Sequence, residues 1–280
     1  MPVHEPERAA PAWLTAGDTT DEVVGLLKTG KEAEVFVVER QAPDDRATLL
    51  AHKRYRPMEL SKGVLEAGGF SKARTFTADA AYQAGRGFGS SRDRRAVARR
   101  SRHGRRLAAD RWARNEYDAL ERAHAAGVTV PYPVEFTGDG ILMQLLGDAG
   151  GAAPRLVSAH LSSAELARAH AQLVDDLAAI VRAGLVHADL SPYNVLWWRE
   201  RAWLIDLPQA VDLVVNPNGF DLLHRDVTTL SAWFARRGVA CDAEATFAAL
   251  LTEAGRRRVR CASSGPSRKG TRARSCGHPR

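Results

Sequence analysis

Apolar and polar positions along this chain follow two different periods, one typical of strands and one typical of helices. An apolar, β-branched run at 35–38 and an extended run at 48–55 flank turn-forming residues at 42–45, which predicts a β-hairpin. Shorter strands are predicted at 128–136, 141–145, 194–198 and 202–206. Apolar residues at helical spacing predict helices at 107–126 and 162–183, and residues 219–253 are also expected to be helical. The chain is therefore expected to mix strands and helices.

Both ends of the chain and one internal stretch lack this periodicity. Residues 1–20 contain three prolines and are expected to form a tail. Residues 56–91 contain several glycines, which predicts a mobile loop. From residue 255 the composition changes to Arg, Ser and Gly, and we expect a disordered basic tail over 255–280. The folded part is expected over 21–254.

Composition narrows the class of protein. The chain has 280 residues, of which 45% are hydrophobic and 26% charged, and this balance excludes a mainly disordered protein. No stretch approaches the roughly 18 apolar residues of a membrane span, and Met1–Arg8 lacks the apolar core of a signal peptide. The three cysteines form no C-x-x-C pair and cannot all be paired in disulfides. We therefore expect a reduced, cytoplasmic protein without a membrane partner.

The net charge of +7 is distributed unevenly. Nine of the 40 basic residues lie in 255–280, which leaves 31 basic against 33 acidic residues in the rest of the chain. A second basic segment, 92–114, contains ten arginines and two aspartates. The chain is therefore an acidic body with two basic segments, which could contact RNA, a ribosomal particle or an acidic partner.

The strongest chemical signal is the run L-V-H-A-D-L-S-P-Y-N-V-L at 185–196, which has the H-x-D-x-x-x-x-N spacing of protein-kinase catalytic loops. This spacing places Asp189 where it can meet an attacking hydroxyl, and Asn194 where it can bind a metal that bridges phosphates. A predicted strand then ends at Asp206, where a kinase places its second metal-binding aspartate. Taken alone, the first motif could arise by chance and Asp206 could cap a strand. The two motifs in this order favour a phosphotransfer site.

These residues resemble the RIO family of atypical protein kinases. The catalytic loop is similar to that family's L-V-H-A-D-L-S-x-Y-N-I-L, and I-D-L-P-Q at 205–209 is similar to its I-D-x-x-Q. The run T-G-K-E-A-E-V at 29–35 resembles its S-T-G-K-E-A-x-V loop, which replaces the glycine-rich loop of other kinases. The form of this loop favours the first RIO subfamily, and we expect a prokaryotic member.

Kinases also need a strand lysine that contacts the nucleotide phosphates and a helix glutamate that holds this lysine. Lys53 resembles the lysine of the family's V-K-x-Y strand, with Arg54 as the alternative. Glu116 fits the family's E-x-x-x-L helix, with Glu121 as the alternative. The S-R-H-G run at 101–104 resembles the family's flexible loop in place and composition.

Two backbone segments would complete the nucleotide site. Gly30 permits close approach of the backbone to a phosphate, and Lys31 adds positive charge. The resemblance implies that the segment after the strand at 141–145 joins the lobes. Backbone groups of Gln144 and Leu146 would then bind the adenine, with Met143 beside the ring.

The resemblance implies an α+β, two-lobed protein-kinase-like fold of RIO type, with an N-lobe over 21–146 and a C-lobe over 147–254. ATP would bind between the lobes together with Mg²⁺ or Mn²⁺, and Asn194 and Asp206 would hold the metal ion. Asp189 would act as the base, and Asp206 could be transiently phosphorylated. About 45 residues separate Gln209 from the basic tail, so a full activation segment cannot be present and the C-lobe is reduced.

These features imply a serine/threonine protein kinase that phosphorylates a protein hydroxyl or itself; the protein substrate is not predicted. Two alternatives stay open. One is an ATPase-driven switch that binds a ribonucleoprotein, and the other is a small-molecule phosphotransferase of the aminoglycoside type.

Overall fold

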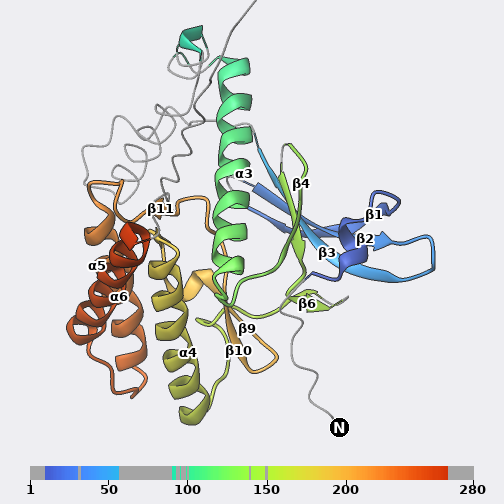
Figure 1. Ribbon diagram of the computed structural model, residues 1–280. Helices are drawn as coiled ribbons and strands as arrows, with labels where there is room; N and C mark the ends of the chain where they lie inside the picture. The colour runs from blue at the N-terminus through green and yellow to red at the C-terminus, as the bar shows by residue number, and fades with distance from the viewer. Residues whose placement is uncertain are drawn as a thin grey trace, which may run out of the picture.

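A computed structural model describes residues 10–30, 33–56, 90–92, 95, 99, 101–138, 140–148 and 151–263. The first lobe is built on a five-stranded sheet with the strand order β1-β2-β3-β5-β4 (Figure 1). Its strands are β1 (Thr20–Thr29), β2 (Ala33–Gln41), β3 (Ala47–Tyr55), β4 (Pro133–Phe136) and β5 (Gly140–Gln144). Neighbouring strands pair antiparallel. The predicted hairpin is confirmed as β2–β3.

The N-terminal tail predicted over 1–20 is wrong for the part that the structure describes. Residues 12–15 form the short 3₁₀ helix η1 (Ala12–Thr15), and β1 begins at Thr20. Leu14 of η1 is fully buried, and it packs in a cluster with Val38, Leu50, Tyr132, Val134 and Leu142. A single buried leucine has no periodicity, so the sequence pattern does not reveal this contact.

A buried arginine fixes the same segment to the sheet. Arg40 of β2 donates a hydrogen bond from Nη1 to the carbonyl oxygen of Leu14 at 2.6 Å. Its guanidinium also forms ion pairs with Asp21 at 2.6 Å and with Glu135 at 2.9 Å. These carboxylates raise the pKa of Arg40 further, so its charge is permanent and compensated.

We predict that Leu14→Ala lowers the free energy of unfolding by about 2–3 kcal/mol, because it removes a buried side chain and leaves a cavity. Urea denaturation measures this difference. Leu26→Ala is the matched control, since Leu26 lies on the same sheet with 56% of its surface exposed, and we expect a change of about 0.5 kcal/mol or less. Equal effects of the two substitutions would show that η1 does not pack on the sheet.

The long helix α3 (Arg102–Ala125) packs against β3, β4 and β5 (Figure 1). Ser101 caps it, because its side-chain oxygen accepts a hydrogen bond from the backbone N–H of Gly104 at 3.0 Å. The S-R-H-G run at 101–104 is therefore the cap and first turn of α3, and the flexible loop expected there is wrong. The helix predicted from 107 begins five residues earlier.

The second lobe consists of helices packed around short strands. Its helices are α4 (Ser163–Arg182), α5 (Gly219–Ala235) and α6 (Ala243–Ser263). Its strands are β8 (Leu185–Val186), which pairs with β11 (Val211–Asp212), and β9 (Val195–Trp198), which pairs with β10 (Arg201–Leu204). A capping box between Ser162 and Glu165 starts α4 at the predicted place. The hinge predicted at 147–154 contains the small hairpin of β6 (Gly147–Asp148) and β7 (Gly151–Ala152).

The disordered tail predicted from 255 is wrong for its first part, because α6 continues to Ser263. Arg256 forms an ion pair with Glu253, which also contacts Arg182 of α4. Arginine has a high helix propensity, so an Arg-rich composition can continue a helix. Residues 264–280 lie outside the described residues.

Within the described part of the chain, no helix is both long enough and apolar enough to cross a bilayer. The loop predicted at 56–91 falls almost entirely outside the residues that the structure describes, and so does Lys31.

Candidate active site

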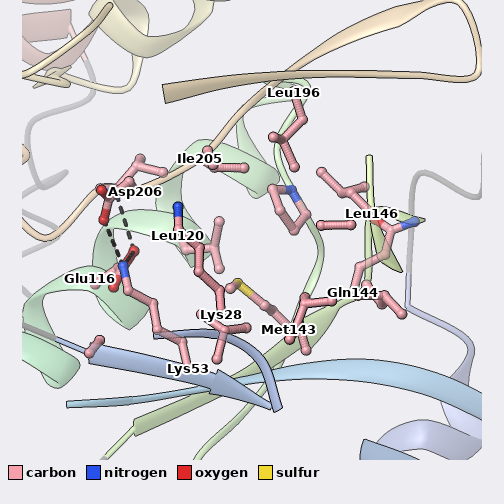
Figure 2. A pocket seen from close by; sticks show the side chains of 18 of the residues that line it. Lys28, Lys53, Glu116, Leu120, Met143, Gln144, Leu146, Leu196, Ile205 and Asp206 are labelled. Atoms are coloured by element: carbon pink, nitrogen blue, oxygen red, sulfur yellow. Dashed lines mark hydrogen bonds and ion pairs between the residues drawn. The ribbon is translucent and has the colours of Figure 1, made fainter. Parts of the chain in front are cut away.

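A cavity of about 520 Å³ lies between the sheet of the first lobe and the second lobe (Figure 2). Its wall is formed by strands β1, β2, β3 and β5, helix α3, the hinge and the segment 205–208. Most of its lining is apolar, including Leu27, Val35, Ala51, Leu120, Met143, Leu196 and Ile205. A largely apolar cavity with a few convergent polar groups is typical of a small-molecule site.

The two carboxylates that line this cavity, Glu116 and Asp206, both contact Lys53. Its Nζ lies 2.8 Å from Oε1 of Glu116 and 2.7 Å from Oδ1 of Asp206 (Figure 2). Burial acts to lower the pKa of Lys53, but the two carboxylates outweigh it and raise the pKa, so the ammonium stays charged. The charge of Lys53 in turn lowers the pKa of Asp206.

Strand alternation decides between Lys53 and Arg54. Consecutive side chains of β3 point to opposite faces of the sheet, and Lys53 is the one that lines the cavity. The guanidinium of Arg54 instead lies 5.8 Å from the ring of Phe36. Burial decides between the two candidate glutamates, because Glu121 is exposed whereas Glu116 is only 2% exposed.

Glu116 is held by three donors. Its Oε1 accepts from Lys53 and from the backbone N–H of Leu207 at 3.2 Å, and its Oε2 accepts from the hydroxyl of Tyr55. Tyr55 is buried at the end of β3 and lines the cavity. The sequence pattern did not single out Tyr55, although its place two residues after Lys53 puts both side chains on one face of the strand.

We predict that Tyr55→Phe lowers ATP turnover about tenfold, because a hydrogen bond to a charged group is lost and Glu116 holds Lys53 less firmly. Turnover is measured with Mg²⁺ present, and a thermal melt checks the fold. Tyr117→Phe makes the same chemical change one residue along α3 from Glu116 and should change turnover less than about twofold. Equal turnover in the two variants would refute the role of Tyr55.

The predicted catalytic loop lies beside this cavity. Asp189 is exposed, and Asn194 is buried at the end of the 3₁₀ turn η3 (Pro192–Asn194). The amide nitrogen of Asn194 donates to the carbonyl oxygen of Asp189 at 2.9 Å and to its carboxylate at 3.2 Å. The carbonyl oxygen of Asn194 accepts from the backbone N–H of Ile205 at 3.0 Å. These bonds fix the loop to the residue before Asp206.

A buried aspartate on α5 holds the backbone of the catalytic loop. Asp226 accepts hydrogen bonds from the N–H of Ala188 at 2.7 Å and of Leu190 at 3.0 Å. Ala188 has φ = 65°, a left-handed conformation that a residue with a Cβ rarely adopts. Burial raises the pKa of Asp226 to about 6, although His187 and the two backbone hydrogen bonds act to lower this pKa. Its partners are 36–38 residues away in sequence, so no local pattern reveals its role.

The hinge backbone leaves specific groups for a ligand. The N–H of Gln144 donates to the carbonyl oxygen of Tyr132 at 3.0 Å, and the carbonyl oxygen of Leu146 accepts from Ala153 at 2.8 Å. Among the hydrogen bonds of the described residues, none uses the N–H of Leu146. Leu146 can therefore offer a donor to a ring in the cavity, and Gln144 could offer only its carbonyl oxygen.

The side chains of Asn194 and Asp206 fit a hard divalent cation that is bound together with phosphate. Asn194 uses its amide nitrogen within the loop, which leaves its amide oxygen for a cation, and Asp206 is 45% exposed at its side chain. Mg²⁺ is commonly bound through one or two carboxylates and completed by substrate phosphates. In the described residues, no group of three or more His, Cys, Asp or Glu side chains forms a metal centre by itself.

Most of the predicted site residues lie at this cavity. Its wall includes Gly30, Lys53, Glu116, Met143, Gln144, Leu146 and Asp206. Asp189 and Asn194 are not part of the wall and lie on the adjoining loop. The structure thus joins Lys53, Glu116 and Asp206 by direct contacts and connects the catalytic loop to them through Ile205.

Known structures share this fold. The crystal structure of the Rio2 kinase–ADP/Mg²⁺–phosphoaspartate complex from Chaetomium thermophilum matches with a TM-score of 0.55 at 19% identity. The match covers 88% of this chain and 68% of that protein. It supports the two-lobed, kinase-like architecture, including the sheet of the first lobe.

Sequence comparisons identify relatives among the RIO kinases. RIO-type serine/threonine-protein kinase Rio1 of Haloferax volcanii is 35% identical over 136 residues, which are 49% of this chain and 46% of that protein. Serine/threonine-protein kinase RIO1 of Caenorhabditis elegans is 31% identical over 216 residues, which are 77% of this chain and 37% of that protein. The chain thus spans less than half the length of these relatives. The family model of the RIO domain matches residues 75–247, well over half of the chain. With the fold, the cavity and this match in agreement, the chain belongs to the RIO family.

Proposed function

We propose that this chain is an ATP- and Mg²⁺-dependent serine/threonine protein kinase of RIO type, which transfers the γ-phosphate of ATP to a protein hydroxyl or to itself. The observation that carries the proposal is the contact of Lys53 with both Glu116 and Asp206 at the cavity beside Asp189. The names of the relatives from H. volcanii and C. elegans support it.

Each residue then has a defined role. The adenine lies among the apolar side chains, where the carbonyl oxygen of Gln144 and the N–H of Leu146 can bind its edge. Lys53, held by Glu116, binds phosphate oxygens. Asp189 orients the acceptor hydroxyl and accepts its proton. Partial desolvation of its carboxyl raises the pKa of Asp189, which favours proton acceptance relative to a free aspartate.

Asn194 and Asp206 would hold Mg²⁺ through their side-chain oxygens. When bound, the ion would neutralise negative charge that develops on the phosphates during transfer. Asp226 keeps Asp189 in place through the loop backbone, so it acts as a positioning residue.

An ATPase switch is the second candidate, favoured by the exposure of Asp206. Its carboxylate is 45% exposed, and the C. thermophilum structure contains a phosphoaspartate. In this reaction an oxygen of Asp206 attacks the γ-phosphorus, the bond to ADP breaks, and water later hydrolyses the acyl phosphate. The basic segments of the chain would then contact a ribonucleoprotein. The helical region after Asp206 contains α5 and α6 alone among the described residues, so nothing favours a small-molecule phosphotransferase.

The experiment is to incubate the protein with γ-labelled ATP and Mg²⁺ and to map the destination of the label. The kinase proposal predicts acid-stable phosphate on serine or threonine. A label that passes through acid-labile phosphate on Asp206 to water supports the switch instead. Unchanged ATP in the presence of folded protein would contradict both.

A further inference from the structure

Two cations of the cavity have no carboxylate partner among the residues that the structure describes. The charged lining residues in this part of the chain are Lys28, Lys53, Glu116, Arg155 and Asp206. Lys53 already contacts both carboxylates. Among the described residues, no ion pair or side-chain hydrogen bond engages Lys28 or Arg155, although both line the same cavity.

Strand register places Lys28 on the same face as Lys53. A bulge in β1 shifts the pairing between Leu26 and Lys28, so Lys28 lies opposite Val35, and Val35 lies opposite Lys53 on the next strand. Side chains of directly paired residues lie on one face of a sheet. Without this bulge, Lys28 would lie on the other face. The two lysine backbones are two strand spacings apart, about 10 Å, and Figure 2 shows Lys28 extending into the cavity toward Asp206.

Arg155 enters the cavity from the other lobe on a fixed backbone. It pairs with Leu196 of β9, and its neighbours bond to the same strand, Leu156 to Val195 at 2.8 Å and Trp197 to Pro154 at 2.9 Å. Partial burial and the nearby charge of Arg155 lower the pKa of Lys28, against the opposing effect of Asp206. Both cations line one cavity, and an anion between them would reduce their mutual repulsion.

We propose that Lys28 and Arg155 form a cation clamp that binds the phosphate chain of the nucleotide from both lobes. The proposal rests on the proposed function and extends it to two residues outside the predicted motif set. Lys28 directly precedes the T-G-K-E-A-E-V run at 29–35. A lysine supplies a positive charge on a flexible side chain, and an arginine supplies a planar guanidinium with several N–H donors. Both groups bind phosphate well.

The test compares ligands that differ only in phosphate. Binding of ATP, ADP and adenosine is measured by calorimetry with Mg²⁺ for the wild type, Lys28→Gln, Arg155→Gln and the double variant. We expect each single substitution to lower the affinity for ATP about three- to tenfold at low ionic strength, and the double substitution to lower it further. Adenosine affinity should stay within about twofold of the wild type, because adenosine carries no charge for the clamp to bind. The effect should shrink at high ionic strength.

Two further variants complete the design. Arg46→Gln removes one charge from the same lobe at an exposed site paired with Asp44, and it should leave ATP binding unchanged. Lys28→Arg should retain most of the ATP affinity. If the double variant binds ATP like the wild type, or if adenosine weakens as much as ATP, the clamp is overturned and the proposed function stands. If the wild type binds no ATP, both are overturned.

Discussion

Asp189→Asn is expected to lower phosphotransfer by about 10²–10⁴-fold while ATP affinity stays within a few-fold of the wild type. A positioned general base contributes an effect of this size, and the amide of asparagine cannot accept the proton of the acceptor hydroxyl. Nucleotide affinity comes instead from the cavity wall, to which Asp189 does not belong. Turnover and calorimetric ATP binding are measured on the same preparation.

Asp175→Asn is the matched control, since Asp175 is exposed on α4. It should leave both quantities unchanged. Near-wild-type turnover of folded Asp189→Asn would contradict the assignment of Asp189. A parallel loss of ATP affinity would indicate that the substitution disrupts the cavity as a whole.

Asp206→Asn is expected to lower turnover by about 10³-fold and to remove the dependence of nucleotide affinity on Mg²⁺. Asp206 supplies the charged oxygen for the cation and one of the two carboxylates at Lys53. Asparagine is chosen because Asp206 has φ = 69°, a conformation that asparagine tolerates better than alanine. Mg²⁺ titration at fixed nucleotide concentration measures the effect.

Asn194→Ala should give a milder Mg²⁺ defect, because it removes a neutral ligand and leaves Asp206 in place. The dependence of nucleotide affinity on Mg²⁺ is therefore expected to fall in the order wild type, Asn194→Ala and Asp206→Asn. The same Mg²⁺ dependence in all three proteins would show that neither residue binds the cation.

The sequence predicted the parts of the site that depend on local spacing. Asp189 and Asn194 are five residues apart in one loop, and Asp206 follows the next hairpin, so chain connectivity alone brings them close together. Strand alternation places Lys53 and Arg54 on opposite faces of the sheet, and the family resemblance favoured Lys53. The family resemblance supplied Glu116, and the structure shows the ion pair with Lys53 directly. The catalytic roles of all these residues stay predictions.

What the sequence missed depends on contacts between distant segments. Asp226 and Tyr55 act through hydrogen bonds that span 36–61 residues. Strand β1 has bulges that break the alternation of apolar and polar residues, and Val23 and Leu26 on it are exposed. Because of these bulges, the sequence pattern did not predict that Lys28 lines the cavity.

The ends of the folded region show a related limit. Leu14 packs on the sheet as a single apolar residue in a segment without periodicity. At the other end, composition alone predicted disorder from 255, whereas α6 continues to Ser263 because arginine is compatible with a helix. Packing and helix continuation decide these boundaries, and composition does not report either one.

The most direct test of the account is a crystal structure of the chain with Mg²⁺ and a non-hydrolysable ATP analogue. We expect the adenine beside Met143 with its edge at Gln144 and Leu146, phosphate oxygens at Lys53, and the cation on Asn194 and Asp206. A nucleotide bound outside this cavity, or a cation held by other residues, would contradict it.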